Sequence, residues 1–250
     1  KTLTVTLNDS AAVATIPLTT VDASAFTGDS LTVTAVEADS GVTVTTGSEA
    51  LSATVGDGAN TITGTTGDDE ITTGSGADTI VSYAGDDTIE AGDGVNTITV
   101  TDGENDIDGG EGVDTITAGN GNNTIDGGDG ADVIVAGTGN NTITNAAGNA
   151  TITAGTGNNT VTNTAGSSTI TLGNGTNTVN LTAGNSTVVT GSGADDINIT
   201  AGNNDITAGA GNDTISLGTG NDTVDGGTGT DTVDFSIDRG TCAGAITDAE

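Results

Sequence analysis

A nine-residue repeat runs without insertion or deletion through most of this chain. Twenty consecutive nonapeptides occupy residues 55–234, and residues 109–117 read GGEGVDTIT. The fourth position is glycine in every repeat, and the eighth is always isoleucine or valine. Self-similarity at a fixed short period is the signature of a solenoid, in which each unit packs against its neighbours.

Each repeat reads as a turn followed by a short strand. Glycines at the second and fourth positions permit positive φ in the turn, and the x-Ile-x triplet that follows favours β-structure. The eighth side chain then points inward, with the seventh and ninth outward. Two repeats form one coil, so the sequence predicts an all-β parallel β-roll (a β-solenoid) of about ten 18-residue coils.

Composition excludes an ordinary globular core and several classes of partner. Glycine supplies 42 residues, tryptophan and methionine are absent, and the aromatic residues are Phe26, Tyr83 and Phe235. The net charge is −33, and the only bases are Lys1 and Arg239. This charge excludes nucleic acid as a partner and disfavours a compact state unless cations neutralise it. No apolar run is long enough for membrane insertion.

The residues that usually carry catalysis or bind zinc are nearly absent. The chain has no histidine and a single cysteine, Cys242, which can be a free thiol or form an intermolecular bridge. Carboxylates are numerous, but they recur with the repeat, and no unique nucleophile or base stands out. We therefore expect that the protein is not an enzyme.

The nonapeptides resemble the RTX (repeats-in-toxin) motif Gly-Gly-x-Gly-x-Asp-x-U-x, a calcium-binding repeat. The resemblance covers 180 of the 250 residues. It implies several Ca²⁺ ions, held by turn carbonyls and sixth-position aspartates, and oxygen ligands also suit calcium chemically. The metal-site candidates are Asp69, Asp78, Asp87, Asp114, Asp132, Asp195, Asp213, Asp222 and Asp231.

Partners across a site are expected to be two repeats apart, because coils stack every 18 residues. Asp195, Asp213 and Asp231 should then line one edge of the roll, Asp114 and Asp132 the other, and Asp69 and Asp87 should form a further pair. An isolated aspartate would more often be a solvated turn residue, but the 18-residue spacing favours calcium.

Departures from the motif predict where calcium is weak or missing. Asparagine supplies only a neutral oxygen at eight sixth positions: Asn60, Asn96, Asn105, Asn123, Asn141, Asn159, Asn177 and Asn204. The turns that begin at residues 64, 82, 100, 145, 163, 181 and 199 lack the second glycine and should be metal-poor. Calcium is therefore expected on one edge early in the array and on the opposite edge later.

The segment 133–194 contains no charged residue. It can be a run of ordinary repeats with Asn and Thr ladders, a lateral packing surface, or an ice-binding surface similar to that of RTX adhesins. The third and fifth positions along one edge would form its outward double row: Asn120, Asn122, Thr138, Asn140, Thr156, Asn158, Asn174 and Thr176.

Three segments are expected: a β-rich N-terminal cap over 1–54, the roll over 55–234 and a tail over 235–250. Alternating runs at 2–7, 31–34 and 42–44 favour strands in the cap. Residues 18–28 are similar to segments that precede RTX arrays in bacterial surface-layer proteins. RTX proteins leave the cell by type I secretion with a C-terminal signal, for which the short tail leaves little room, so we expect the chain to be incomplete.

The leading functional hypothesis is an extracellular, calcium-binding structural protein of a bacterial cell surface: a surface layer (S-layer), a filament or an adhesin segment. Its expected partners are calcium ions and either further copies of itself or a cell-surface glycan or lattice. The alternative is a calcium-dependent ice-binding β-roll, and a pure secretion-and-folding module is the third hypothesis.

Overall fold

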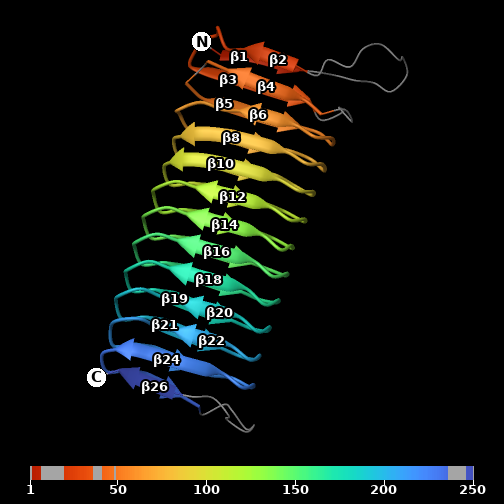
Figure 1. Ribbon diagram of the computed structural model, residues 1–250. Helices are drawn as coiled ribbons and strands as arrows, with labels where there is room; N and C mark the ends of the chain where they lie inside the picture. The colour runs from red at the N-terminus through yellow and green to blue at the C-terminus, as the bar shows by residue number, and fades with distance from the viewer. Residues whose placement is uncertain (1, 7–19, 36–40, 48, 236–245, 250) are drawn as a thin grey trace. The chain divides into compact units, whose positions relative to one another are not determined.

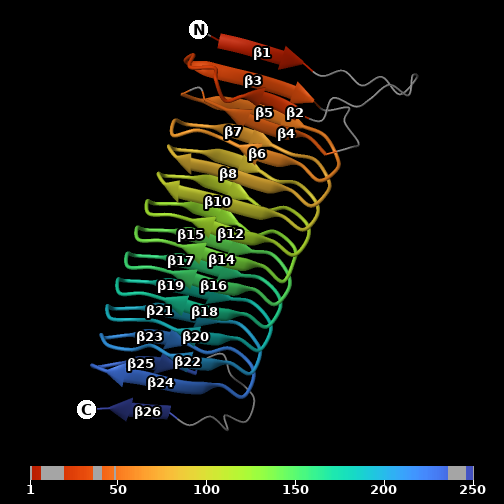
Figure 2. The ribbon, with the colours of Figure 1, turned by 45° about the horizontal axis from the view of Figure 1, so that its top comes forward.

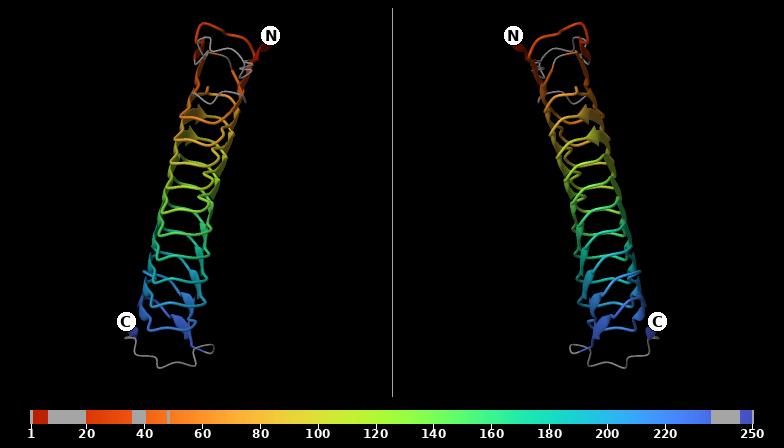
Figure 3. Two further views of the ribbon diagram at one scale, coloured as in Figure 1. Left: turned by 90° about the vertical axis from the view of Figure 1, so that its right-hand side faces the viewer. Right: turned by 90° about the vertical axis from the view of Figure 1, so that its left-hand side faces the viewer.

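The computed structural model describes residues 2–6, 20–35, 41–47, 49–235 and 246–249, the last of these for the backbone alone. Every regular element among them is a β-strand. Two compact units, residues 1–126 and 127–250, make up the chain. Within each unit, two parallel sheets face each other and turns connect them at both edges (Figures 1, 2 and 3). The expected all-β parallel β-roll is confirmed.

The first unit contains strands β1 to β13. One of its sheets has the order β1-β3-β5-β7-β9-β11-β13 and the other β2-β4-β6-β8-β10-β12. The strand bounds are β1 Thr2–Thr6, β2 Thr20–Ala23, β3 Ser30–Ala35, β4 Thr43–Thr46, β5 Leu51–Val55, β6 Thr61–Thr63, β7 Glu70–Thr72, β8 Thr79–Ala84, β9 Thr88–Glu90, β10 Thr97–Asp102, β11 Asp106–Asp108, β12 Thr115–Ala118 and β13 Thr124–Asp126.

The second unit contains strands β14 to β26. Its even-numbered strands follow one another in one sheet and its odd-numbered strands in the other. The strand bounds are β14 Val133–Ala136, β15 Thr142–Asn145, β16 Thr151–Ala154, β17 Thr160–Asn163, β18 Thr169–Leu172, β19 Thr178–Leu181, β20 Thr187–Val189, β21 Asp196–Ile199, β22 Asp205–Thr207, β23 Thr214–Ser216, β24 Thr223–Thr228, β25 Thr232–Asp234 and β26 Ile246–Ala249.

The register between neighbouring strands follows the predicted coil length of 18 residues. In the second unit Ile152 of β16 pairs with Ile170 of β18, and in the first unit Ile62 of β6 pairs with Ile80 of β8. Each repeat therefore stacks on the repeat two places later, and equal turn positions meet along an edge.

Eighth-position side chains form the central core layer. Ile62, Ile116 and Ile170 are fully buried, and the flanking seventh and ninth residues are more exposed, as predicted. Val233 is the exception, because this residue is only half-buried at the end of the array. First-position residues such as Val100 and Leu172 are also buried, which the strand pattern alone did not indicate.

The residues before the nonapeptides continue the same two sheets. Strand β1 pairs with β3, β3 with β5, and β5 with the repeat strand β7, all in parallel. The alternating run at 31–34 lies within β3, the run at 42–44 overlaps the start of β4, and β1 covers most of the run at 2–7.

Some features named in the sequence fall outside the described residues: Lys1, Leu7, Leu18, Thr19, Arg239 and Cys242. Among the described residues, no helix is long and apolar enough to cross a membrane.

Candidate metal sites in the turns

Consecutive turns along an edge are in direct backbone contact. Gly92 and Gly94, the second and fourth residues of one turn, both have positive φ, as do Gly110 and Gly112 one coil later. A Cβ on Gly112 would overlap the carbonyl oxygen of Gly94. Glycine is required at Gly112 because the turns stack this closely and because φ is left-handed there, as it is at most fourth positions.

Sixth-position side chains form a ladder inside each edge. The backbone N–H of a sixth residue donates to the side-chain oxygen of the sixth residue one coil later. In the second unit, Asn177 N donates to Asp195 Oδ1 (2.7 Å), Asp195 N to Asp213 Oδ1 (2.8 Å) and Asp213 N to Asp231 Oδ1 (3.0 Å). One oxygen of each aspartate is thus already used by the fold.

The other carboxylate oxygen, Oδ2, has no protein donor in several of these aspartates. It is buried and makes no hydrogen bond in Asp78, Asp87, Asp195, Asp213 and Asp231. A buried carboxylate oxygen without a partner is costly, so each of these atoms requires a counter-charge or a proton. Stacked aspartates place such atoms in adjacent coils, as in the row that ends at Asp231.

This arrangement fits a cation with hard oxygen ligands. No group of three or more His, Cys, Asp or Glu side chains that could hold a metal occurs among the described residues. A cation would therefore use the sixth-position carboxylates together with backbone carbonyls, a ligand set that suits Ca²⁺. Because the sixth-position aspartates of turns one coil apart are hydrogen-bonded to each other, a cation bound to one of them would also link neighbouring coils.

The structure distinguishes the nine candidate aspartates from one another. Asp195, Asp213 and Asp231 lie in one row as expected, and Asp69 and Asp87 are neighbours, because Asp69 N donates to Asp87 Oδ1 (2.9 Å). Asp114 lies in the first unit and Asp132 in the second, and both are fully buried. Asn96 N donates to Asp114 Oδ1 (2.7 Å).

Asp69 differs because its own turn satisfies both carboxylate oxygens. Oδ2 accepts a hydrogen bond from Thr65 N (2.7 Å), and Oδ1 accepts from Thr65 Oγ1 (2.9 Å) and Leu51 N (2.7 Å). Thr65 replaces the second glycine of this turn. Burial raises the pKa of Asp69 to about 6. This carboxylate acts as a turn cap within the fold.

Burial also raises the pKa of Asp87 and of Asp213. Ionising either carboxylate inside the roll is unfavourable without a compensating positive charge. Among the candidate aspartates of the second unit, Asp222 is more accessible than Asp132, Asp195 and Asp213, and only Asp231 is more accessible still. Asp222 Oδ1 accepts hydrogen bonds from Asn204 N (2.8 Å) and Asn204 Nδ2 (3.0 Å).

The turns that lack the second glycine do not form one class. Tyr83 adopts positive φ (70°) in place of glycine, the one non-glycine residue to do so in the described parts of the chain. Asp87, in the same turn, keeps its unpartnered Oδ2. The turns over 145–150, 163–168 and 181–186 instead place Ala150, Ser168 and Ser186 at the sixth position and have no carboxylate there.

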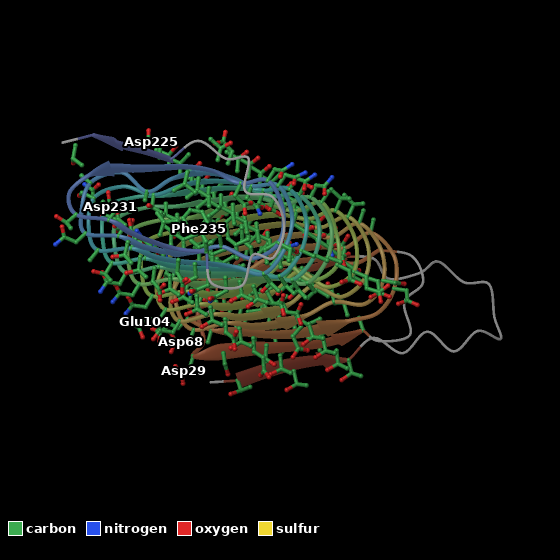
Figure 4. All side chains as sticks on the ribbon, turned by 90° about the horizontal axis from the view of Figure 1, so that it is seen from below. Asp29, Asp68, Glu104, Asp225, Asp231 and Phe235 are labelled. Carbon is green, nitrogen blue, oxygen red and sulfur yellow. The ribbon has the colours of Figure 1, made fainter. Side chains whose placement is uncertain are left out.

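An exterior row lies outside the sixth-position ladder on the same edge. In the first unit, Asp86 N donates to Asp68 Oδ1 and Glu104 N to Asp86 Oδ1, and these fifth-position acids are exposed. Figure 4 labels two of them, Asp68 and Glu104. All eight residues of the expected outward double row are exposed. Asn140 Oδ1 accepts from Asn158 N (2.7 Å) and Asn158 Oδ1 from Thr176 N (2.8 Å). These amides therefore also join coils.

Sequence reasoning missed the amide nitrogens of the sixth-position asparagines. Asn159 Nδ2 donates to the carbonyl oxygens of Gly155 (3.1 Å) and Gly157 (3.0 Å), the second and fourth residues of its own turn. The signal was present, since asparagine differs from aspartate by a donor as well as a charge.

The nonapeptide array matches a known family of repeats. The model described as the RTX calcium-binding nonapeptide repeat (4 copies) matches residues 54–89, 81–116, 90–125, 108–143, 144–167, 171–198 and 199–233. All nine candidate aspartates lie in these segments. No curated protein and no solved structure matches the chain.

Proposed function

The chain belongs to the RTX calcium-binding nonapeptide repeat family, and from this premise we propose that it is an extracellular structural protein of a bacterial cell surface. It would serve as a segment of a surface layer, filament or adhesin that calcium folds and makes rigid. The observation that carries the proposal is the stacked row of buried, unpartnered Oδ2 atoms at Asp195, Asp213 and Asp231.

The residues proposed to hold calcium are sixth-position aspartates of stacked turns. In the described turns with free Oδ2 atoms they are Asp78, Asp87, Asp195, Asp213 and Asp231. Asp114 and Asp132 join this set by their turn position and burial, and Asp222 by its position. Bound calcium would supply the positive charge that these carboxylates lack. Asp69 is left out, because Thr65 already satisfies its carboxylate.

A structural role follows from how the candidate groups are distributed. The same carboxylate and carbonyl groups recur from coil to coil, so the candidate ligands are distributed along an edge and are not gathered in one place. A catalytic site needs a distinct constellation of acid, base or nucleophile in one place. Repeated ions between stacked turns instead stabilise the array, because a ligand that binds only the folded state stabilises that state.

The charge of the chain favours an extracellular setting. With a net charge of −33, self-repulsion opposes the compact state until cations bind. Extracellular calcium modules bind calcium with dissociation constants of about 10⁻⁴–10⁻³ M. Sites of that strength would stay empty at low cytoplasmic calcium and fill after export, so folding would follow secretion.

Assembly of the purified chain tests this proposal. Electron microscopy and sedimentation would be performed in millimolar calcium and again with excess chelator. The proposal predicts ordered sheets or fibres in calcium that dissociate in chelator. Dispersed particles under both conditions would contradict the surface-assembly role. Inhibition of ice growth by such dispersed, calcium-loaded particles would favour the ice-binding alternative.

A further inference from the structure

Along one edge of the second unit, the sixth-position row changes from asparagine to aspartate. Asn141, Asn159 and Asn177 are followed by Asp195 and then Asp213. All five are almost fully buried, and the register places them in successive coils. Asparagine and aspartate can therefore be compared at the same turn position within one unit.

The asparagine amides occupy the carbonyl oxygens of their own turns. Asn141 Nδ2 donates to Gly137 O (3.3 Å) and Gly139 O (3.2 Å). Asn177 Nδ2 donates to Gly173 O and Gly175 O, both at 3.1 Å, and Asn159 makes the equivalent pair of bonds. The glycines are the second and fourth residues of each turn, so the amide provides N–H groups inside the turn.

The same asparagines keep the ladder between coils intact. Asn141 N donates to Asn159 Oδ1 and Asn159 N to Asn177 Oδ1, both at 3.2 Å. The amide nitrogens also reach the next coil, from Asn141 to Asn159 Oδ1 (2.9 Å) and from Asn159 to Asn177 Oδ1 (3.1 Å). Asparagine therefore contributes both an acceptor and a donor, where ionised aspartate contributes acceptors alone.

On the opposite edge of the same coils, neutral side chains also make the hydrogen bonds between turns. Ala150 N donates to Ser168 Oγ and Ser168 N to Ser186 Oγ, both at 3.1 Å. Asn145 Nδ2 donates to Asn163 Oδ1 (3.2 Å). Since residues 133–194 contain no charged group, nothing in these coils needs a counter-ion.

We infer that the sixth-position amides take the place of calcium in these turns, so that the coils over residues 136–181 stay folded without the ion. The coils over 190–234 need calcium, because the Oδ2 atoms of Asp195, Asp213 and Asp231 have no protein donor. The second unit thus joins a calcium-independent segment to a calcium-dependent one. The inference rests on the proposed calcium binding and assigns it to particular coils.

The physical reason is electrostatic. The buried amide nitrogens of Asn141, Asn159 and Asn177 are satisfied by the carbonyl oxygens of their own turns. Stacked buried carboxylates instead repel one another, and their charge is not compensated until a cation binds. Loss of calcium would release the coils over 190–234 first. The coils over 136–181 would remain as a folded template on which the rest of the unit reforms.

Hydrogen–deuterium exchange of the full chain, in calcium and after chelation, tests the inference. Chelation should lower amide protection by more than about a hundredfold in residues 208–234 and by less than about tenfold in residues 138–180. Equal loss in both segments would overturn the inference and leave calcium-dependent folding standing. If neither segment responds, the inference and the calcium-dependent role both fail.

Paired variants test the role of the buried amides. Asn159→Asp with Asn177→Asp removes both amides and adds two buried charges. In chelator, protection of residues 138–180 should then fall by more than about a hundredfold and return in calcium. The matched control, Asn140→Asp with Asn158→Asp, adds the same charge in the exposed row of the same coils and keeps its oxygen acceptors.

The control variant should retain the protection of the wild-type chain in chelator. An equal loss in the two variants would show that added charge alone unfolds the segment, which would overturn the role of the amides. The comparison of segments in the wild-type chain is independent of whether either variant folds.

Discussion

Two adjacent serines allow the contributions of the buried and the exposed ladder to folding stability to be compared. Ser168 Oγ accepts the N–H of buried Ala150 (3.1 Å) and donates to Asn163 Oδ1 (3.2 Å). Ser167 Oγ accepts the N–H of Asn185 (2.9 Å) in the exposed row. Each serine thus bonds a backbone amide one coil away, and the two differ chiefly in burial.

Ser168→Ala leaves the N–H of Ala150 buried without its acceptor. Such a group costs about 1–3 kcal/mol, so we expect a loss of about 2 kcal/mol, or about 30-fold in the folding equilibrium. Ser167→Ala should cost less than about 0.5 kcal/mol, because water replaces the lost hydroxyl. Asn163 Oδ1 keeps a donor in either variant, since Asn145 Nδ2 also bonds it.

Urea denaturation in chelator, followed by circular dichroism, measures both variants against the wild-type chain. The segment that carries both serines is the one expected to stay folded without calcium. Losses that agree within about 0.5 kcal/mol, or a larger loss for Ser167→Ala, would refute the claim that buried sixth-position side chains hold the coils together.

Three further predictions concern single positions of the first unit. Burial raises the pKa of Asp69 to about 6 from its ordinary 3.8. The contribution of Asp69 to the stability of the metal-free chain is therefore complete below about pH 3.8 and is lost as the pH rises through 6. A metal-free chain that melts at a higher temperature at pH 7 than at pH 4 would contradict this. Gly112→Ala should destabilise the first unit by more than about 2 kcal/mol, because its methyl group meets the carbonyl of Gly94, and denaturant titration measures the loss. Tyr83→Gly should raise the stability by about 1 kcal/mol by relieving a positive φ, and an unchanged melting temperature would count against this.

The nonapeptide pattern was sufficient to predict the fold. Strict spacing of the eighth position fixes which side chains face inward, and Ile152 and Ile170 meet in the predicted register. The buried first position was not predicted, because residues as different as Ala118, Asn145 and Leu172 occupy it. Their burial follows from where the chain enters the turn, which periodicity of residue type does not reveal.

The rows in which the candidate aspartates stack were predicted from their spacing, but their hydrogen bonds were only partly visible in the sequence. The spacing correctly placed Asp195, Asp213 and Asp231 in one row. The capping of Asp69 by Thr65 was not foreseen, because it depends on the path of the backbone in one turn. Nothing in the residue pattern indicated that Oδ1 belongs to the ladder and Oδ2 does not.

Equilibrium calcium binding to an Asp195→Asn, Asp213→Asn and Asp231→Asn variant tests the central claim most directly. Each substitution keeps the Oδ1 acceptor of the ladder and replaces the unpartnered Oδ2 with an amide donor. The account predicts fewer bound calcium ions per chain than in the wild type, and protection of residues 190–234 that persists in chelator. An unchanged number of bound ions would contradict the assignment of calcium to the sixth-position carboxylates.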